Sequence, residues 1–523
     1  MTKNITLEQL DANKEIKAGA VVSYLSLLVD LVLALFYTPY LISILGESQF
    51  GIYSLAMSIV TFFVMDFGIG ASVTRFLALY RSKGDFKSIE NFLGITLKIY
   101  FIIDLVLFII LSISFAFINR IFIQLDSEEI GIFKAVFIVS SVFSLYSLFA
   151  SPLNGILMAF ERFYFLKITV LISRLTSVLL ILFVIQYYPF VYIVVLINAF
   201  IGVLVSFVKL KYIKKRLISR INWRNKDLKL VKQIFGFSVF VILSIIFEQL
   251  TVNFGPIVLG IVAGGTTHIA FYAIGQTVYI FVVGIASAMN GLFLPKVSRL
   301  IESKTRTDIL NLMIRVGRLQ FYIMGLIILG IISMGNEFVS LWMGDGFNSV
   351  YMVILYLVIP YLIISSMDIA YMTIVAEGKM HLRVIGTGVS AILSLLIGST
   401  GAIYFGAVGM AFGVAVGNII GNIAVMIWVY HFHLKINMRL FFKECHMKLF
   451  GPWSSILVLS IALQSFFELE SILFFVLKVI IITIFYILLM WFTAMNSFEK
   501  NLIIDSIKKF NNGFNTFISK IEK

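Results

Sequence analysis

Long apolar runs constrain this chain more than any other feature of its sequence. A helix that crosses a bilayer needs about 20 apolar residues, and the 523-residue chain contains roughly fourteen such runs separated by short polar breaks. Only 13% of the residues are charged, against about 25% in soluble domains. The runs are continuous rather than alternating, which excludes an outer-membrane β-barrel. The sequence therefore predicts an all-α polytopic membrane protein and excludes soluble enzymes, secreted disulfide scaffolds and DNA-binding proteins.

The apolar runs predict about 14 transmembrane helices. Their expected ranges are 18–45, 51–73, 91–118, 131–157, 165–186, 190–210, 235–262, 268–293, 311–335, 350–376, 383–404, 406–430, 449–467 and 472–494. The first run is too long for a secretory signal and has no small-residue cleavage pattern. The single cysteine, Cys445, cannot form an internal disulfide and leaves no Cys-based metal site.

The basic residues predict the orientation of these helices. With the N-terminus inside, 34 of the 41 Lys and Arg residues fall on cytoplasmic segments, and the outer connections hold only Arg120 and Lys134. This distribution follows the positive-inside rule at every alternation. The net charge of +14 therefore indicates orientation rather than nucleic-acid binding, and both termini are expected in the cytoplasm.

An internal repeat predicts two lobes. Ser26 and Asp30 match Ser244 and Glu248 at a shift of 218, and the shift changes little along both halves. Helices one to six and seven to twelve are therefore expected to be two copies of one unit in the same orientation, with a pathway between them, as in transporters. Helices thirteen and fourteen stand outside the repeat as accessory helices.

The predicted domains follow from the repeat and the charge pattern. They are a cytoplasmic N-terminal segment (1–17), an N-lobe (18–210), a basic cytoplasmic linker (211–234), a C-lobe (235–432), accessory helices (433–496) and an amphipathic cytoplasmic tail (497–523). The basic stretch from Lys209 to Lys232 is expected to lie against anionic lipid head groups. A strip of glycines four residues apart is expected to serve helix packing; it comprises Gly409, Gly413, Gly417 and Gly421.

Ionisable groups inside the spans are the candidate substrate-binding residues, because such groups are expensive in lipid and usually face a cavity or each other. They are Arg174, Asp30, Glu248, Lys98, Arg315, Arg318, Asp66, Asp104 and Asp368. Arg174 either meets an anionic substrate group or forms a structural ion pair. Arg315 and Arg318 share a helical face and could clamp a phosphate, although snorkelling to head groups is favoured. Lys478 is expected to snorkel outward.

Motifs of soluble enzymes are absent from the sequence. It contains no phosphate-binding Gly-xxxx-Gly-Lys-Ser/Thr loop, and His431 and His433 on a loop do not make a metal site. We therefore expect a transporter with no catalytic residues, no metal and no cofactor. A coupling ion, either a proton or sodium, stays open.

Several segments resemble those of a known family. They are 259–260, 270–274 and 294–299 in the second half, 45–53 and 66–68 in the first, and 338–344 and 376–379. In these segments the chain resembles the polysaccharide flippases, the O-antigen type of oligosaccharide-lipid translocase, in the multidrug/oligosaccharidyl-lipid/polysaccharide (MOP) exporter superfamily.

The resemblance implies both a fold and an activity. It implies two six-helix lobes with alternating access, and movement of undecaprenyl-diphosphate-linked oligosaccharides to the outer leaflet of a bacterial plasma membrane for surface polysaccharide biosynthesis. It implies as partners the lipid-linked substrate, membrane lipids, and a polysaccharide polymerase with other assembly proteins, but no nucleic acid. The alternative is a cation-coupled multidrug exporter of the same superfamily. A membrane-embedded polymerase or ligase is a third reading, disfavoured by the short outer loops.

Overall fold

The described residues form an all-helical chain. The computed structural model describes residues 2–63, 69–218, 220–223, 239–263, 265–290, 293–302, 306–466 and 471–505. Within these ranges no β-strand occurs, which confirms the all-α prediction. Asp66 lies outside the described residues, as do parts of the predicted linker and tail.

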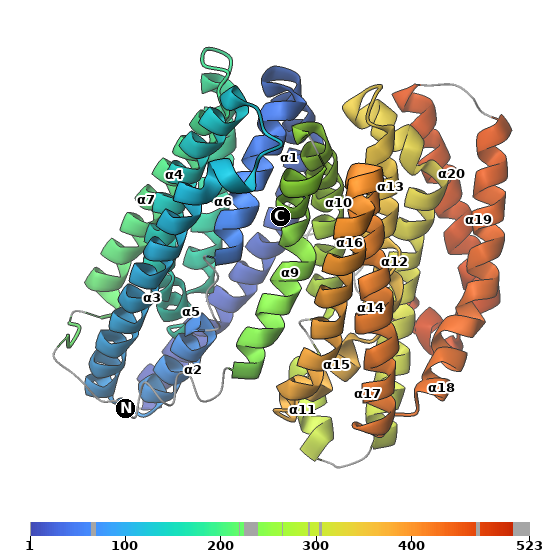
Figure 1. Ribbon diagram of the computed structural model, residues 1–523. Coiled ribbons are helices and arrows are strands. Elements are labelled where there is room, and N and C mark those ends of the chain that lie inside the picture. The colour runs from blue at the N-terminus through green and yellow to red at the C-terminus, as the bar shows by residue number, and fades with distance from the viewer. Residues whose placement is uncertain are drawn as a thin grey trace, which may run out of the picture. The chain divides into compact units, whose positions relative to one another are not determined.

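Most of the described helices follow one another with short connections (Figure 1). In the first half they are α1 (Thr2–Phe63), α2 (Ile69–Ser82), α3 (Phe86–Ile121), α4 (Ser127–Ala150), α5 (Pro152–Ala159), α6 (Phe163–Val184) and α7 (Val191–Arg216). In the second half they are α9 (Val239–Val262), α10 (Thr266–Asn290), α11 (Leu294–Glu302), α12 (Arg306–Met343), α13 (Asn348–Val358), α14 (Tyr361–Ser366), α15 (Asp368–Ala376), α16 (Met380–Gly417), η1 (Asn418–Val425), α17 (Met426–Phe432), α18 (Met438–Phe442), η2 (Lys443–Met447), α19 (Lys448–Phe466), α20 (Ile472–Leu489) and η3 (Met490–Ala494).

The predicted spans correspond to these helices. Among the described residues, eleven helical stretches are long and apolar enough to cross a membrane. Two of them each contain two helices, because Gly46 (φ 79°) and Gly406 (φ 54°) interrupt the helical backbone. Glycine adopts such a positive φ without the steric cost that a side chain brings. With these helices counted separately and α19 included, each of the fourteen predicted spans has a counterpart.

The chain divides into two compact units, which are described separately. Unit 1 contains residues 1–281, 352–357 and 379–426, and unit 2 contains residues 282–351, 358–378 and 427–523. These units are groups of packed helices and do not coincide with the predicted lobes 18–210 and 235–432. The two lobes rest on the internal repeat and stay a prediction.

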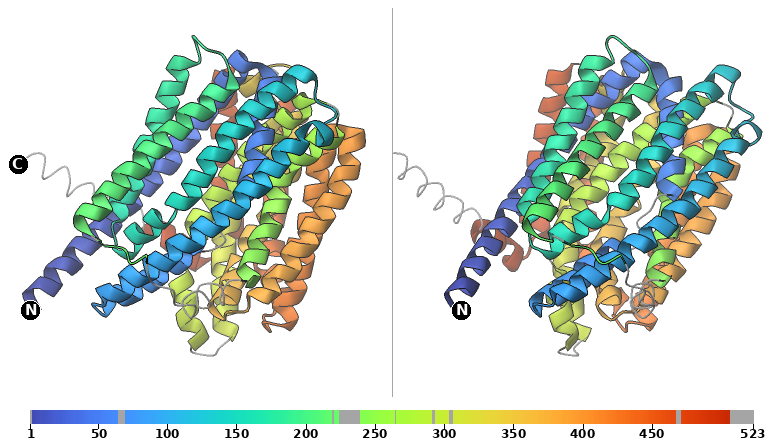
Figure 2. Two further views of the ribbon diagram at one scale, coloured as in Figure 1. Left: turned by 60° about the vertical axis from the view of Figure 1, so that its left-hand side comes forward. Right: turned by 90° about the vertical axis from the view of Figure 1, so that its left-hand side faces the viewer.

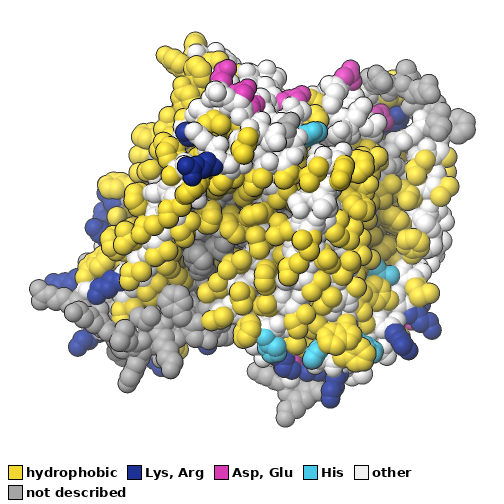
Figure 3. Space-filling model, in the orientation of Figure 1, with side chains coloured by type: hydrophobic (Ala, Val, Ile, Leu, Met, Phe, Trp, Pro, Cys, Tyr) yellow, Lys and Arg dark blue, Asp and Glu magenta, His cyan; other side chains and the backbone are white. Residues whose placement is uncertain are grey.

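In unit 1, long helices run side by side (Figures 1 and 2). Helix α1 packs against α4, α6 and α9, while α4 packs against α3 and α7. The outer surfaces of these helices are apolar; on α3, Ile102, Leu105 and Phe108 are each more than half exposed. Figure 3 shows hydrophobic side chains along the middle of the helices on the visible face of unit 1. So broad an apolar surface is typical of contact with lipid.

Equivalent residues of the predicted repeat meet at one carboxylate in unit 1. Ser48 and Thr266, which are 218 positions apart, each donate a hydroxyl hydrogen bond of 2.8 Å to Oε1 of Glu129. Glu129 also closes a capping box with Asp126 at the start of α4. One acidic side chain therefore joins the α1, α4 and α10 helices at the end that the charge pattern predicts to be outside.

The glycine strip packs one helix against another, as predicted. A Cβ atom built on Gly409 would lie 2.0 Å from the carbonyl oxygen of Gly401, and one on Gly413 would lie 2.2 Å from Gly398. Gly421 meets the backbone of Gly386 and Ser390 in the same way. The contacts pair residues before and after Gly406 in antiparallel order. The segments 380–405 and 407–425 thus form a tight helical hairpin.

Unit 2 is organised around the long helix α12. Helices α14, α15, α19 and α20 pack against it. The indole Nε1 of Trp453 on α19 donates 2.8 Å to the carbonyl of Gly325, and the hydroxyl of Tyr486 on α20 donates 2.9 Å to the carbonyl of Tyr322. The accessory helices are therefore attached to α12 by hydrogen bonds as well as by apolar contact.

Candidate functional site

Two ion pairs lie on four helices of unit 1 that pack in the order α6, α1, α9 and α16. Asp30 of α1 forms an ion pair with Arg174 on α6, with Oδ1 3.3 Å from Nε. Glu248 of α9 accepts from an Nη group of Arg383 on α16 at 3.2 Å. In the predicted repeat, both acids are on the first helix and both arginines are on the fifth helix. Each acid therefore pairs within its own repeat.

Three of these side chains are about half exposed. The exposed fraction is 50% for Arg174, 41% for Asp30 and 49% for Glu248, whereas Arg383 is 15% exposed. Half-exposed charges on membrane-spanning helices are stable only where water or a polar ligand reaches them. The two ion pairs therefore mark a polar surface, which we define as the candidate site.

The surroundings of Arg174 leave it able to bind an anion. Its Nε meets Asp30, but among the described residues neither Nη group has a hydrogen-bond partner. The side chain also interacts electrostatically with Tyr37 and Tyr53 of α1. Arginine presents its donors in a planar fork that matches phosphate and carboxylate oxygens. In this geometry Arg174 can form the ion pair with Asp30 and contact an anionic group at the same time.

The second pair has a similar polar neighbourhood. Tyr279 of α10 interacts electrostatically with both Glu248 and Arg383. No three His, Cys, Asp or Glu side chains among the described residues come together as they would around a metal ion. The arrangement offers donors and acceptors for a polar ligand rather than a set of metal ligands.

Other predicted site residues lie elsewhere. Lys98 and Asp104 are half-buried on α3, and Oδ1 of Asp104 is buried without a hydrogen-bond partner in the described part of the chain. Asp368 begins α15 in unit 2. Among the described candidates, the structure pairs Asp30 with Arg174, and it pairs Glu248 with a residue outside the predicted set. Whether the remaining candidates bind substrate stays a prediction.

Arg318 does not snorkel to a membrane surface. Its side chain is 6% exposed and forms an ion pair with Glu499, 3% exposed, in the helical segment 497–505. Arg315, one turn away, stacks over the ring of Phe498 at 4.8 Å. The two arginines that share a helical face thus meet the chain segment after α20. The snorkelling prediction is wrong for Arg318 because a carboxylate far along the sequence compensates its charge.

Lys478 also differs from expectation. Its Nζ lies 3.0 Å from both carboxylate oxygens of Glu337 on α12, and its side chain is 10% exposed. The prediction that Lys478 snorkels outward is therefore wrong. An acid that the sequence placed in an outer connection instead neutralises a lysine of the accessory helix.

Sequence reasoning missed Arg383, which it counted with the basic residues of a cytoplasmic connection. The helix begins at Met380, so Arg383 lies within its first turn and reaches α9. One signal was available: the fifth helix of each predicted repeat carries an arginine, Arg174 in one and Arg383 in the other. Comparing the repeats for charge partners, rather than for identical residues, would have found this pair.

The fold and the site define a class of protein. The described part of the chain is all-helical, has eleven stretches long and apolar enough to cross a membrane, and carries charged pairs on several of them, as a multi-pass membrane protein does. A profile of the family described as "Polysaccharide biosynthesis protein" matches residues 16–301, more than half of the chain. The chain belongs to this family.

Relatives and solved structures agree with that family. The "Uncharacterized membrane protein EpsK" of Bacillus subtilis (strain 168) is 21% identical over 330 residues, which cover 62% of this chain and 64% of that protein. The chain therefore spans less than two thirds of this relative's length.

Among solved structures, the "Lipid II flippase MurJ, inward closed conformation" superposes with a TM-score of 0.72 and 16% identity over 93% of this chain and 99% of that chain. A "multidrug resistance MATE family transporter of the MOP superfamily" in an inward-facing conformation gives a TM-score of 0.62 and 16% identity over 79% of this chain and 98% of that one. The Vibrio cholerae MATE transporter VcmN in the bent form gives a TM-score of 0.54 and 14% identity over 83% of this chain and 99% of that one. At these identities the likeness establishes the fold alone, which is that of MOP superfamily transporters.

Proposed function

We propose that the protein is a flippase that moves undecaprenyl-diphosphate-linked oligosaccharide repeat units from the cytoplasmic to the outer leaflet of a bacterial plasma membrane. Membership of the polysaccharide biosynthesis family carries this proposal. The shared fold with the lipid II flippase, which covers 93% of this chain, supports it. The proposed cargo combines an anionic diphosphate, a glycan and a polyprenyl chain.

The candidate site supplies chemistry suited to such a cargo. The open Nη groups of Arg174 would bind a diphosphate oxygen, and the carboxylates of Asp30 and Glu248 would accept from sugar hydroxyls. Two lobes would alternate access to this polar surface while the polyprenyl chain stays in the bilayer.

The membrane potential gives the movement its direction. A diphosphate with about two negative charges that leaves a cell interior at −100 mV gains about 4 to 5 kcal/mol, at about 2.3 kcal/mol per charge. Outward movement is therefore electrically downhill without a coupled ion. The proposal also includes association with a polymerase and other assembly proteins. The coupling ion, a proton or sodium, is left to measurement.

The direct test measures the sidedness of the lipid-linked intermediate. In bacterial cells that lack the protein, we expect the glycan-lipid to accumulate where a membrane-impermeant reagent cannot reach it, and the wild-type gene to restore exposure. For substitutions in the two ion pairs, the matched control is Arg120→Ala. Arg120 is an exposed residue in the last turn of α3 and belongs to neither ion pair. Normal outward exposure of the glycan-lipid in the deleted strain would refute the proposal.

A cation-coupled multidrug exporter is the second candidate, favoured by the fold shared with MATE transporters. Asp30 and Glu248 would then bind cations. This function predicts that cells lacking the protein become sensitive to cationic dyes while their lipid-linked intermediates keep normal sidedness. The two candidates thus give opposite results in one strain.

The proposed orientation has its own test, because the sequence has one cysteine and Cys445 is buried. In a Cys445→Ser background, a Glu128→Cys variant is expected to react with an impermeant thiol reagent in intact cells. A Lys83→Cys variant, between α2 and α3, is expected to react only after permeabilisation. The reverse pattern would place the termini outside.

A further inference from the structure

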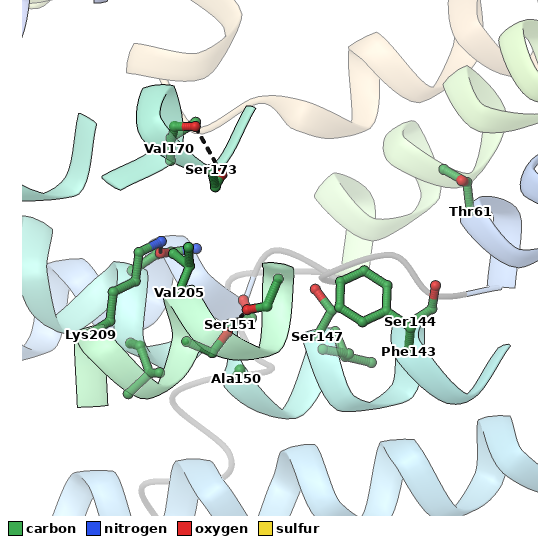
Figure 4. Close-up of a pocket in the computed structure, with 15 residues that line it drawn as sticks. Thr61, Phe143, Ser144, Ser147, Ala150, Ser151, Val170, Ser173, Val205 and Lys209 are labelled. Atoms are coloured by element: carbon green, nitrogen blue, oxygen red, sulfur yellow. Dashed lines mark hydrogen bonds between the residues drawn. The ribbon is translucent and has the colours of Figure 1, made fainter. Parts of the chain in front are cut away.

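A polar cavity lies inside unit 1, apart from the two ion pairs. It has a volume of about 430 Å³, is partly open, and is lined by parts of α1, α4, α5, α6 and α7. Its polar lining includes Thr61, Ser144, Ser147, Ser151, Asn154 and Lys209. Neither Asp30, Arg174, Glu248 nor Arg383 lines it. Figure 4 shows Lys209 at one end and the hydroxyls of Ser151, Ser147 and Ser144 leading toward Thr61 at the other.

The sequence explains why the hydroxyls form a row. Ser144, Ser147 and Ser151 are three and four residues apart, a spacing that puts side chains on one face of a helix. Helix α4 ends at Ala150, and Pro152 begins α5, because proline has no N–H to continue the hydrogen-bond ladder. The resulting break gives Ser151 and Asn154 access to the same cavity.

Among the residues that the structure describes, Lys209 is the single charged group that lines this cavity. Its relative exposure is 8%, and its Nζ donates 3.0 Å to Oδ1 of Asn154. Within the described residues no carboxylate lies at ion-pair distance from Lys209, and Asn154 is its one hydrogen-bond partner. A buried ammonium without a counter-charge is costly and favours an anionic partner. The sequence counts Lys209 with the basic stretch 209–232, but α7 continues to Arg216, so Lys209 lies within the helix.

The hydroxyl groups can take part in binding an anion. In the part of the chain that the structure describes, the hydroxyls of Ser144 and Ser147 have no hydrogen-bond partner, and both face the cavity. A hydroxyl donates one hydrogen bond, so each can serve an additional phosphoryl or sugar oxygen. The ammonium of Lys209 would repel a cationic ligand from the same space.

An apolar cavity adjoins the polar one. It has a volume of about 470 Å³ and shares Ala150, Leu153 and Ser206 with the polar cavity as lining residues. Its other walls are mainly apolar, with Lys214 as a charged lining residue, and include Leu97, Phe149, Ile156, Phe207, Leu210 and Trp223. The two cavities together therefore place a positive, hydroxyl-lined space directly beside a mainly apolar one.

We propose that these adjoining cavities form one binding site for a lipid whose phosphoryl group meets Lys209 and whose hydrocarbon chain occupies the apolar cavity. Neither half alone identifies such a ligand, since the polar half suits any small anion and the apolar half any hydrocarbon. A phosphoryl lipid is the chemistry that fits both. Such a lipid has two sources, the polyprenyl-phosphate end of the proposed cargo or a phospholipid of the membrane.

The experiment measures lipid binding to the full-length, detergent-purified protein by native mass spectrometry. The probes are farnesyl phosphate, farnesol, dioleoylphosphatidylglycerol and inorganic phosphate. We expect farnesyl phosphate to bind at least tenfold more tightly than farnesol and inorganic phosphate, because it alone among these three fills both cavities. Lys209→Met keeps the length of the side chain and removes its charge, and is expected to weaken farnesyl phosphate binding about tenfold.

Matched variants separate binding from folding. Lys211→Gln changes an exposed lysine on the same helix that lines neither cavity, and should leave the affinity unchanged. Lys209→Arg should restore most of the affinity, and Ser147→Ala should weaken it a few-fold without disturbing folding. Equal binding by the wild type and Lys209→Met, or equal binding of farnesol and farnesyl phosphate, would overturn the proposal.

The lipid probes also identify the source. A preference for farnesyl phosphate over the diacyl phospholipid, dependent on Lys209, supports the site and ties it to the proposed cargo. Equal, Lys209-dependent binding of both supports the site with a membrane phospholipid as occupant. Because binding is measured on purified protein, failure of this inference leaves the proposed transport to be decided by leaflet sidedness.

Discussion

Arg318 and Glu499 are 181 residues apart in the sequence and form a buried ion pair with Nε 2.5 Å from Oε1. The same guanidinium donates to the backbone carbonyls of Glu444 and Ala494, and the hydroxyl of Tyr322 donates 2.9 Å to Oε2 of Glu499. Arg318 of α12 thus contacts both the segment before α19 and the segment after α20. These contacts of one charged side chain attach the ends of the accessory helices to α12.

Removing one partner of this pair is expected to destabilise unit 2. Glu499→Gln or Arg318→Ala leaves a buried charge uncompensated, which typically costs about 3 to 5 kcal/mol. The midpoint of thermal unfolding in detergent measures the loss. Arg315→Ala is the control, because it removes an exposed contact with Phe498 worth about 0.5 to 1 kcal/mol. Equal shifts in the two arginine variants would contradict this assignment.

The pair between Lys478 and Glu337 predicts a different pattern. Lys478→Met alone should destabilise the protein by about 3 kcal/mol, because Glu337 would stay buried without its counter-charge. The double variant Lys478→Met with Glu337→Leu should recover most of this loss, since apolar side chains of similar volume replace a buried pair well. Thermal unfolding of the four variants in a double-mutant cycle gives the coupling. Additive losses would show that the pair contributes nothing.

Arg174 offers a test of the proposed transport. Arg174→Ala is expected to abolish outward exposure of the glycan-lipid at normal membrane levels, and Arg174→Lys to retain part of it, because lysine keeps the charge but loses the planar fork. Asp30→Asn should impair transport less, since it releases the guanidinium instead of removing it. Leaflet sidedness, corrected for protein level by immunoblot, measures each effect. Normal transport by Arg174→Ala would restrict the residue to a structural role.

Glu129 is expected to stabilise the end of unit 1 at which it lies. Glu129→Ala removes the acceptor shared by Ser48 and Thr266 together with half of a capping box, and should cost about 2 to 3 kcal/mol. Glu128→Ala changes the neighbouring exposed acid and should cost little. The midpoints of thermal unfolding of the two variants test this expectation. Similar midpoints would mean that water replaces the carboxylate of Glu129 as acceptor without loss of stability.

The stability of unit 2 should depend on pH through His446, which lies before α19 with Nε2 3.1 Å from Oγ of Ser366. Burial lowers the pKa of His446 from 6.5 to about 4. The unfolded chain therefore binds the proton more readily, so stability is complete above about pH 6.5 and falls by up to about 3 kcal/mol as the pH approaches 4.

Comparing His446→Gln with the exposed His433→Gln between pH 7.5 and 4.5 tests this dependence. The unfolding midpoint of the first variant should fall less steeply with acid than that of the wild type. The second variant should retain the full slope. Parallel curves for all three proteins would assign the pH dependence to other groups.

The helices could be predicted from the sequence and the charge partners could not. Each span is a local run of apolar residues, and even the breaks at Gly46 and Gly406 coincide with ends of predicted helices. An ion pair such as Arg318 with Glu499 depends on which helices pack together, and nothing local to either residue identifies the other. Lys209 lies at the end of the predicted span 190–210 and is counted with the basic stretch 209–232, whereas the helix continues to Arg216.

The candidate site was predicted in part. Depth in the span and the repeat selected Asp30, Glu248 and Arg174, which the structure places on neighbouring helices; that they bind substrate stays a prediction. The serines of the polar cavity gave no comparable signal, because isolated hydroxyls in apolar helices usually bond to their own backbone. Only the folded arrangement of α4 and α7 brings them beside Lys209.

The glycine contacts across Gly406 also limit how this protein can change shape. Backbone touches backbone along the hairpin formed by 380–405 and 407–425, so no side-chain rotation can loosen it, and sliding would drive peptide groups into one another. We therefore expect the hairpin to move as a single rigid body if the protein changes conformation as proposed. Spectroscopic labels on the segments 380–405 and 407–425 should keep one separation in every state. The hairpin would then serve as a fixed reference for measuring the movements of the other helices.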